Sequence, residues 1–310
     1  TRTAGDPAGE TQEIQPLAGW VVVSALPTDL SGVLKAWRAY QRSSRQRSTP
    51  LSDPWSNFLA GSWHGTPVWV GSIGPGDDAA HRFVEQLRDT DVEGVLIISR
   101  ASALTEQIRA GQIVAPSEFR VAERMHHRFV PDPVAVDLFR RQLGGLTPTF
   151  GTVRLLTSSE TLRSVSAKRQ LKRSFGADLL DAEGGALIRA VACSGRLRWA
   201  VVSSVLDDHD EFTPAWRRLS EYSRWVRPLV RLGHLLRRPS ELRSGLRLWR
   251  REPAGLRELG RVVGRLFEAL RVQPKSYVSD TASTTRIFVG AAETNSRLSG
   301  PAPAADRDAS

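Results

Sequence analysis

Apolar positions along the chain form two patterns, short continuous runs and longer stretches with helical spacing. Short, largely apolar runs predict strands, and they cover residues 20–26, 57–63, 66–73, 94–98, 111–116, 153–157, 177–180 and 197–206. Stretches with an apolar residue every three or four positions predict amphipathic helices over 28–40, 79–87, 165–175 and 183–193. His64-Gly65 predicts a tight hairpin, and Thr28 predicts an N-cap. Because strands and helices alternate, the pattern predicts an α/β sheet with helices on both faces.

The two ends of the chain show neither pattern. Residues 1–19 are rich in Gly, Pro, Thr and Glu, and the chain ends in SGPAPAADRDAS. We therefore expect a disordered tail over 1–19 and a mobile tail over 273–310. Between them we expect an α/β domain over 20–213 and a basic helical extension over 214–272 that packs on it.

Positive charge is concentrated in that extension. The chain has 43 Lys and Arg against 33 Asp and Glu, a formal net charge of +10. Residues 214–272 hold 15 Arg, 5 Glu and no Lys, so the remainder is neutral. We expect Pro228, Pro239 and Pro253 to break the segment into short helices. Two interpretations stay open: Arg-rich helices at an anionic membrane surface, or a helical layer that packs its Leu face on the sheet and shows Arg to solvent. Nucleic acid is the less favoured partner.

Cysteine content and hydropathy bear on the compartment. Cys193 has no second cysteine with which to form an internal disulfide, and we expect it to be a small buried residue. No apolar run reaches the roughly 18 residues needed to cross a bilayer, and no signal peptide is visible. We expect a cytoplasmic protein, associated with a membrane only if the basic segment contacts one.

Four segments, in order and spacing, resemble the purine nucleoside phosphorylase and nucleosidase superfamily. They are 65–80 with the loop SIGPG, 94–116 with SRASAL, 166–192 with the turn DAE, and 201–214, where a strand ends at Asp207. The resemblance implies a three-layer α/β/α sandwich with a central mixed sheet, cleavage of a purine N-ribosidic bond by phosphate or water, and a homo-oligomer. No cofactor-binding sequence accompanies these motifs, so we expect none beyond phosphate as a co-substrate.

The same resemblance implies roles for three carboxylates. Asp207 matches the acid that protonates or hydrogen-bonds a purine ring nitrogen, and Glu183 matches the glutamate that binds ribose hydroxyls. Asp29 lies where nucleosidases carry a glutamate that helps to orient the attacking water. The alternatives are an acidic loop that caps the following helix, for Asp207, and first-turn helix acids, for Glu183 and Asp29. We expect no metal at Asp207 to Asp210, because adjacent loop residues point in different directions.

The other candidates surround the expected pocket. Gly74 lets the backbone approach a ligand, and Ala182 stands where the family carries a methionine against the sugar. Ser99 and Ser102 replace two glycines of a loop near the nucleophile. Arg100 lies between them, and three interpretations stay open: it binds phosphate oxygens, it blocks the pocket, or it pairs with a carboxylate.

Two further features bear on substrate and activity. Residues 229–260 resemble the tail of the hopanoid-associated phosphorylases, which act on a nucleoside joined to a membrane lipid. This implies a lipid-linked nucleoside as substrate and peripheral membrane contact through 214–272. The rival hypothesis is a catalytically degenerate nucleoside-binding or membrane-associated module of the same fold, because two glycines are missing and Ser203 replaces an arginine four residues before Asp207.

Overall fold

The computed structural model describes residues 19–122, 124–142, 152–158, 164–181, 183–211, 242–272 and 288–289. Its strands are β1 (Gly19–Ser24), β2 (Thr49–Pro50), β3 (Phe58–Trp63), β4 (Thr66–Ser72), β5 (Val92–Ala103), β6 (Ile113–Val114), β7 (Glu118–Val121), β8 (Arg124–Phe129), β9 (Arg154–Thr157), β10 (Leu179–Asp181), β11 (Arg198–Val205) and β12 (Phe288–Val289). Its helices are α1 (Ser31–Ser43), α2 (Asp77–Leu87), α3 (Pro133–Gln142), α4 (Val165–Phe175), α5 (Gly185–Cys193) and α7 (Leu242–Val272). The expected tails, except for 19 and 288–289, and residues 214–241 with Pro228 and Pro239 lie outside the described residues.

The long strand β5 is the centre of the sheet. It pairs in parallel with β1 on one side and β11 on the other, while its last residues pair antiparallel with β10. Beyond β1 lie the parallel β4 and the antiparallel β3 and β2, and beyond β10 lie β9, β7, β8 and β12. The predicted hairpin is confirmed: β3 and β4 are joined by His64 and Gly65, both with positive φ. Since β1, β4, β5 and β11 are parallel, the segments that follow them meet at one edge.

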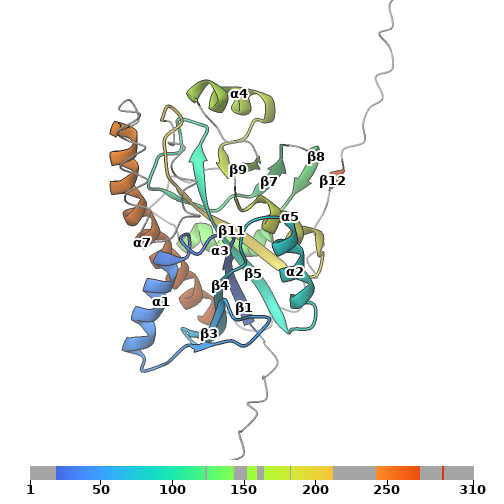
Figure 1. Cartoon of the computed structure of the whole chain (residues 1–310), viewed down its shortest axis with the longest axis vertical. Coiled ribbons are helices and arrows are strands. Elements are labelled where there is room, and N and C mark those ends of the chain that lie inside the picture. Colours follow the sequence, from blue (N-terminus) through green and yellow to red (C-terminus); the bar gives the residue numbers. More distant parts are fainter. Residues whose placement is uncertain are drawn as a thin grey trace, which may run out of the picture.

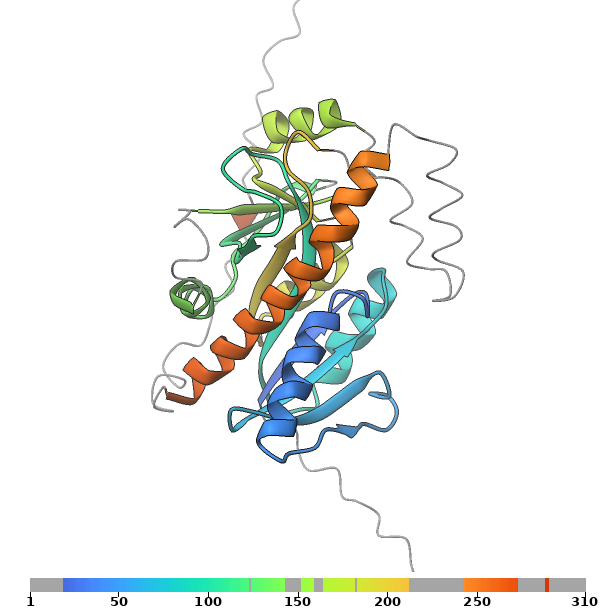
Figure 2. The ribbon, with the colours of Figure 1, turned by 90° about the vertical axis from the view of Figure 1, so that its left-hand side faces the viewer.

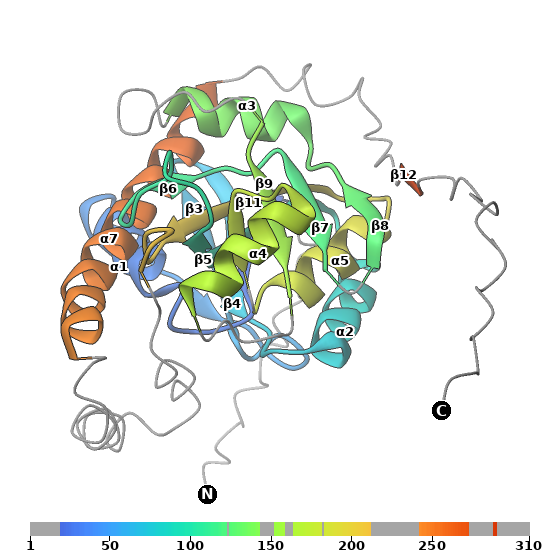
Figure 3. The ribbon, with the colours of Figure 1, turned by 90° about the horizontal axis from the view of Figure 1, so that it is seen from above.

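Helices cover both faces of this mixed sheet, which confirms the three-layer α/β/α prediction. α1 and α7 lie on one face, whereas α2 and α5 lie on the other (Figure 1). The view from above separates the same two pairs on either side of the strands (Figure 3). α3 packs against α7 and β11.

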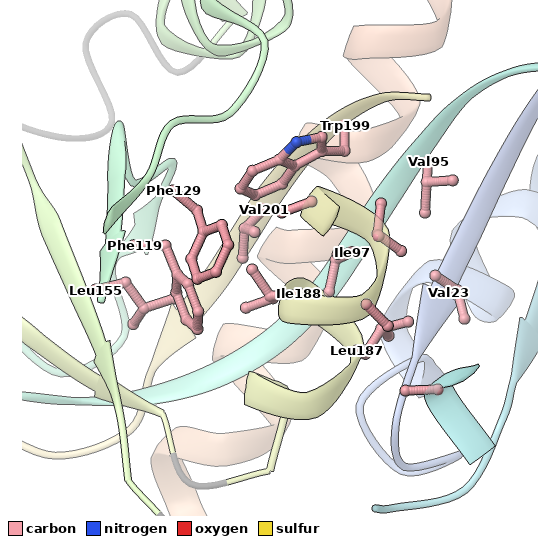
Figure 4. Packing of buried hydrophobic residues seen from close by; sticks show 14 of the residues in the cluster. Val23, Val95, Ile97, Phe119, Phe129, Leu155, Leu187, Ile188, Trp199 and Val201 are labelled. Carbon is pink, nitrogen blue, oxygen red and sulfur yellow. The ribbon is translucent and has the colours of Figure 1, made fainter. Parts of the chain in front are cut away.

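Alternation along the central strands divides the core in two. Val21 and Val23 of β1 belong to the cluster under α2 and α5, whereas Val22 belongs to the cluster under α1 and α7. In the first cluster, Leu187 and Ile188 of α5 point toward the strands (Figure 4). Both faces of the central strands are therefore buried, which explains why their sequences read as continuous apolar runs.

The C-terminal helix α7 is part of the core rather than an appendage. Its inward residues Leu259, Val263 and Phe267 are fully buried, and it lies alongside α1 (Figure 2). A Cβ on Gly32 of α1 would lie 1.7 Å from the Leu256 carbonyl oxygen, so the two helix backbones nearly touch. From residue 251 onward, α7 packs its apolar side inward and shows arginines to solvent, as the second interpretation of this segment predicted.

Three local expectations are wrong, and some elements were not predicted. α7 continues through Pro253, whose exposed ring faces solvent, where the packed inner side keeps the helix intact. Cys193 is exposed, because it is the last residue of α5. Helix α1 begins after Leu30 with no side-chain cap, so Thr28 is not its N-cap. Helix α3 and strands β7 and β8 were not predicted, because their residues lack a clear period.

Candidate active site

The candidate residues gather at the carboxyl edge of the parallel strands. Asp29 follows β1, Gly74 follows β4 and Asp207 follows β11. Gly74 has a φ of 87° and open space where a Cβ would stand, so a ligand can approach its backbone. The backbone N–H of Ile73 donates to the Ser24 carbonyl oxygen (3.2 Å), which holds the Gly74 loop beside the end of β1.

Arg100 lies within this edge, almost fully buried, and each of its three guanidinium nitrogens has a partner. Nε forms an ion pair with Asp29, and Nη1 forms one with Glu252 of α7. Nη2 donates to the Thr28 hydroxyl at 3.2 Å. Of the three interpretations of Arg100, the structure supports pairing with carboxylates.

The sequence led us to expect a loop over Ser99–Ser102, but the structure shows a strand there. It is the last third of β5, where Ser99 and Arg100 pair with Ser203 and Ser204 of β11, and Ser102 pairs with Leu180 of β10. The reason is local: without the two glycines, nothing interrupts the strand, so the backbone N–H groups bond to neighbouring strands. The Ser99 and Ser203 hydroxyls are hydrogen-bonded to each other (2.7 Å).

Asp29 is a buried residue that precedes α1, so the interpretation as a first-turn helix acid is wrong. The Ser24 hydroxyl donates to its Oδ2 at 3.2 Å, and the Thr28 hydroxyl donates to its Oδ1 at 3.4 Å. With the Arg100 ion pair, these contacts fix the carboxylate at the end of β1.

The end of β10 and the turn after it place two more acids at this edge. Asp181 is buried, and its Oδ1 accepts hydrogen bonds from the backbone N–H groups of Glu183 (2.8 Å) and Gly184 (3.0 Å). Glu183 precedes the Gly184 N-cap of α5, so it too is not a first-turn acid. A Cβ on Gly185 would lie 1.9 Å from the Thr157 hydroxyl, so the turn requires glycine there. Ala182 lies outside the described residues.

Electrostatics tie these groups together. Burial alone would lower the pKa of Arg100, but the carboxylates of Asp29, Glu252 and Glu183 outweigh it and raise that pKa above its ordinary value. Burial raises the pKa of Asp181, against the opposing effect of the N–H groups of Gly184 and Glu183. One cation is therefore surrounded by several acids.

Asp207 lies at the same edge in a second buried ion pair. Its Oδ2 lies 3.0 Å from Nζ of Lys168, a fully buried residue of α4, and Lys168 also donates to the Asp208 carbonyl oxygen (2.8 Å). The family places an arginine at the position of Ser203, so here a cation beside Asp207 comes from another element. The spacing around Lys168 predicts an amphipathic helix but gives no sign that this lysine pairs with Asp207.

The acids after Asp207 point elsewhere. Oδ1 of Asp208 accepts from the Ala110 backbone N–H (2.8 Å), and Oδ2 lies 3.3 Å from Arg251. His209 lies 3.5 Å from Glu106. Among the described residues, no group of three or more His, Cys, Asp or Glu side chains is arranged to hold a metal ion.

The lipid-linked substrate and the membrane contact implied by the C-terminal region stay predictions. Most of 229–260, the stretch that resembles hopanoid-associated phosphorylases, has no described side chains. Across the described part of the chain, no helix combines the length and apolar character needed to span a bilayer.

The overall fold matches solved structures of known proteins. The fold is similar to the 5′-methylthioadenosine/S-adenosylhomocysteine nucleosidase of Campylobacter jejuni (TM-score 0.59, 10% identity, covering 81% of this chain and 99% of that one). It is equally similar to the corresponding nucleosidase of S. pneumoniae, solved with a transition-state inhibitor (TM-score 0.59, 14% identity, 81% and 99% covered). Futalosine hydrolase of Helicobacter pylori also matches (TM-score 0.55, 12% identity, 82% and 97% covered). No curated protein matches the chain. The sequence profile of the Phosphorylase superfamily matches residues 21–225, about two thirds of the chain, and the protein belongs to that superfamily.

Proposed function

We propose that this protein hydrolyses the N-ribosidic bond of a purine nucleoside. Membership of the Phosphorylase superfamily and a fold shared with nucleosidases support cleavage of this bond. We choose water over phosphate because Arg100, the cation at this point of the edge, is already paired with the carboxylates of Asp29 and Glu252.

Phosphate would enter this edge only at a high electrostatic cost. Its dianion needs a cation whose charge is not already balanced, but Arg100 is paired with two carboxylates and also donates to the Thr28 hydroxyl. Two further acids add negative charge: Glu183 interacts with the same guanidinium, and Asp181 interacts with Asp29. Water carries no charge, so the same surroundings accept it.

Different acids act on the departing base and on the attacking water. Cleavage sends the electron pair of the C1′–N bond to the base, which takes a proton, while the water oxygen bonds to C1′ and loses a proton. We assign Asp207 as the acid that donates a proton to the departing purine. Lys168 is the buried ammonium that returns a proton to Asp207. Glu183 binds ribose hydroxyls, and Asp29, held by Arg100, orients the water and takes the proton that the water loses. Exchange with solvent then removes that proton from Asp29 and returns one to Lys168. The proposed reaction uses no cofactor.

The experiment is release of free base from a panel of purine nucleosides. The panel includes adenosine, 5′-methylthioadenosine, because the names of two similar proteins include it, and a 5′-lipid-linked adenosine, because of the C-terminal resemblance. Asp207→Asn is expected to lower the rate at least about a hundredfold, as general acids contribute about 10²–10⁴. Asp210→Asn, an exposed acid of the same loop, is the matched control and keeps the rate.

The rival, a binding module without turnover, makes a different prediction. A nucleoside would then raise the melting temperature of the protein while no base is released from any member of the panel. Base release by wild type and loss in Asp207→Asn alone would exclude it.

A further inference from the structure

The outward sides of α1 and α7 form one strongly basic surface. Because α1 and α7 lie side by side on one face of the sheet, their solvent sides point the same way (Figure 2). We define the α1/α7 face by the exposed cations of the two helices: Lys35, Arg38, Arg42, Arg257, Arg261, Arg265 and Arg271.

Few acids oppose these cations. Helix α1 has no acidic residue. On the described part of α7 that faces solvent, Glu258 pairs with Arg261 at 2.9 Å, and Glu268 is exposed. The arginine side chain of that pair is still 70% exposed. The surface therefore carries a clear excess of positive charge, and α1 contributes to it together with the Arg-rich segment identified from the sequence.

Charge and composition favour one kind of partner. A second copy of the same face would be repelled by like charges. Single-stranded nucleic acid is usually gripped by exposed aromatic rings, and none of the exposed positions of α1 or of α7 from residue 251 onward is aromatic. Arginine spaced every four residues along one helix side, at 257, 261 and 265, suits a continuous array of phosphate and carboxylate groups.

We propose that the α1/α7 face binds the surface of a lipid bilayer that contains anionic lipids. The cations contact lipid headgroups, while the apolar sides of both helices stay in the protein core. Binding is peripheral and electrostatic, so it weakens as salt concentration rises. This surface differs from the 214–272 segment expected from the sequence, because α1 forms part of it.

The test is sedimentation of the full chain with vesicles of phosphatidylcholine, with or without phosphatidylserine. The variant carries Arg257→Gln, Arg261→Gln and Arg265→Gln. The matched control carries Arg82→Gln, Arg88→Gln and Arg196→Gln, three exposed arginines around α2 and α5 on the opposite face of the sheet. Both variants lose the same net charge, and melting temperatures verify that both are folded.

We expect the wild type to bind only vesicles that contain phosphatidylserine. Since one basic residue near an anionic bilayer strengthens binding about fivefold, the α7 variant should bind about a hundredfold more weakly. The control should bind within about threefold of wild type, because exposed charges beyond a Debye length are screened. Absence of vesicle binding, equal losses in both variants, or tighter binding to an oligonucleotide than to vesicles that carry the same charge would each overturn the proposal. None of these readouts depends on nucleoside cleavage.

Discussion

Arg100 and Glu252 are separated by 152 residues in the chain, yet they form a buried ion pair at the carboxyl edge of the sheet. Arg100 comes from the central strand β5, and Glu252 comes from the C-terminal helix α7. Asp29 pairs with the same guanidinium through a different nitrogen. The position of α7 is thereby coupled to the acid that we assign to the attacking water.

Removing the Glu252 charge should destabilise the protein more than removing a neighbouring glutamate. Glu252→Gln weakens a mostly buried contact with a cation, for which we expect a loss of about 1.5–3 kcal/mol in the free energy of unfolding. Glu258→Gln breaks an exposed pair on the same helix and should cost about 0.2–1 kcal/mol. Urea denaturation of both variants measures the difference. Equal losses would show that the Arg100 contact does not anchor α7.

The buried pair of Lys168 and Asp207 should be strongly non-additive. Lys168→Met leaves a buried carboxylate without its ammonium, so we expect a loss of about 3–5 kcal/mol in unfolding free energy. Adding Asp207→Asn should recover part of that loss, because the uncompensated charge disappears. A double-mutant cycle in urea gives the coupling energy. If the two losses simply add, the ion pair is not formed in solution.

Asp181 should make stability depend on pH. Its pKa is raised by burial above the ordinary 3.8, so the folded state binds the proton more tightly than the unfolded state. The resulting stabilisation is present below pH 3.8 and is lost as pH rises through the raised pKa. The side-chain amide introduced by Asp181→Asn would keep the two backbone hydrogen bonds through its carbonyl oxygen and remove the buried charge.

The variant should therefore melt at a higher temperature than wild type near neutral pH, and the difference should shrink as the solution is acidified. Melting curves across this range measure it. A lower melting temperature for Asp181→Asn at neutral pH would mean that the charged form of Asp181 is the stabilising one.

The contact between α1 and α7 should depend on Gly32. In Gly32→Ala, the new Cβ would overlap the Leu256 carbonyl, so the helices must separate, and we expect a loss of at least about 3 kcal/mol. In Gly264→Ala on α7, the Cβ would lie 3.3 Å from the Trp63 ring, a contact that needs only a small shift. Thermal unfolding compares the two. A mild Gly32→Ala would contradict the close crossing.

The spacing of apolar residues and the residues typical of turns were sufficient to predict much of the fold. The buried strands β1, β5 and β11 read as apolar runs because helices cover both of their faces, and β3 and β4 were located by His64-Gly65. Alternation of strands and helices then gave the layers. The predicted helix break at Pro253 was wrong, because a proline on the solvent-facing side of a well-packed helix is tolerated.

The site was predicted only where a motif is local. The positions of Asp29, Glu183 and Asp207 after strands could be predicted, and in the structure Asp29 and Glu183 both interact with Arg100. Glu252 has no local signal, because its role depends on where α7 crosses the sheet. Lys168 likewise looks like an ordinary helix lysine until its burial against Asp207 is known. Long-range ion pairs of this kind require the tertiary structure.

The most direct measurement is the sugar product formed from the cleaved nucleoside, with and without phosphate in the buffer. Our account predicts free base and free ribose at a rate that phosphate does not change, and loss of both products in Asp207→Asn. Formation of ribose 1-phosphate, with a rate that rises with phosphate concentration, would contradict it, because the anion would then bind at an edge where two carboxylates already balance the charge of Arg100.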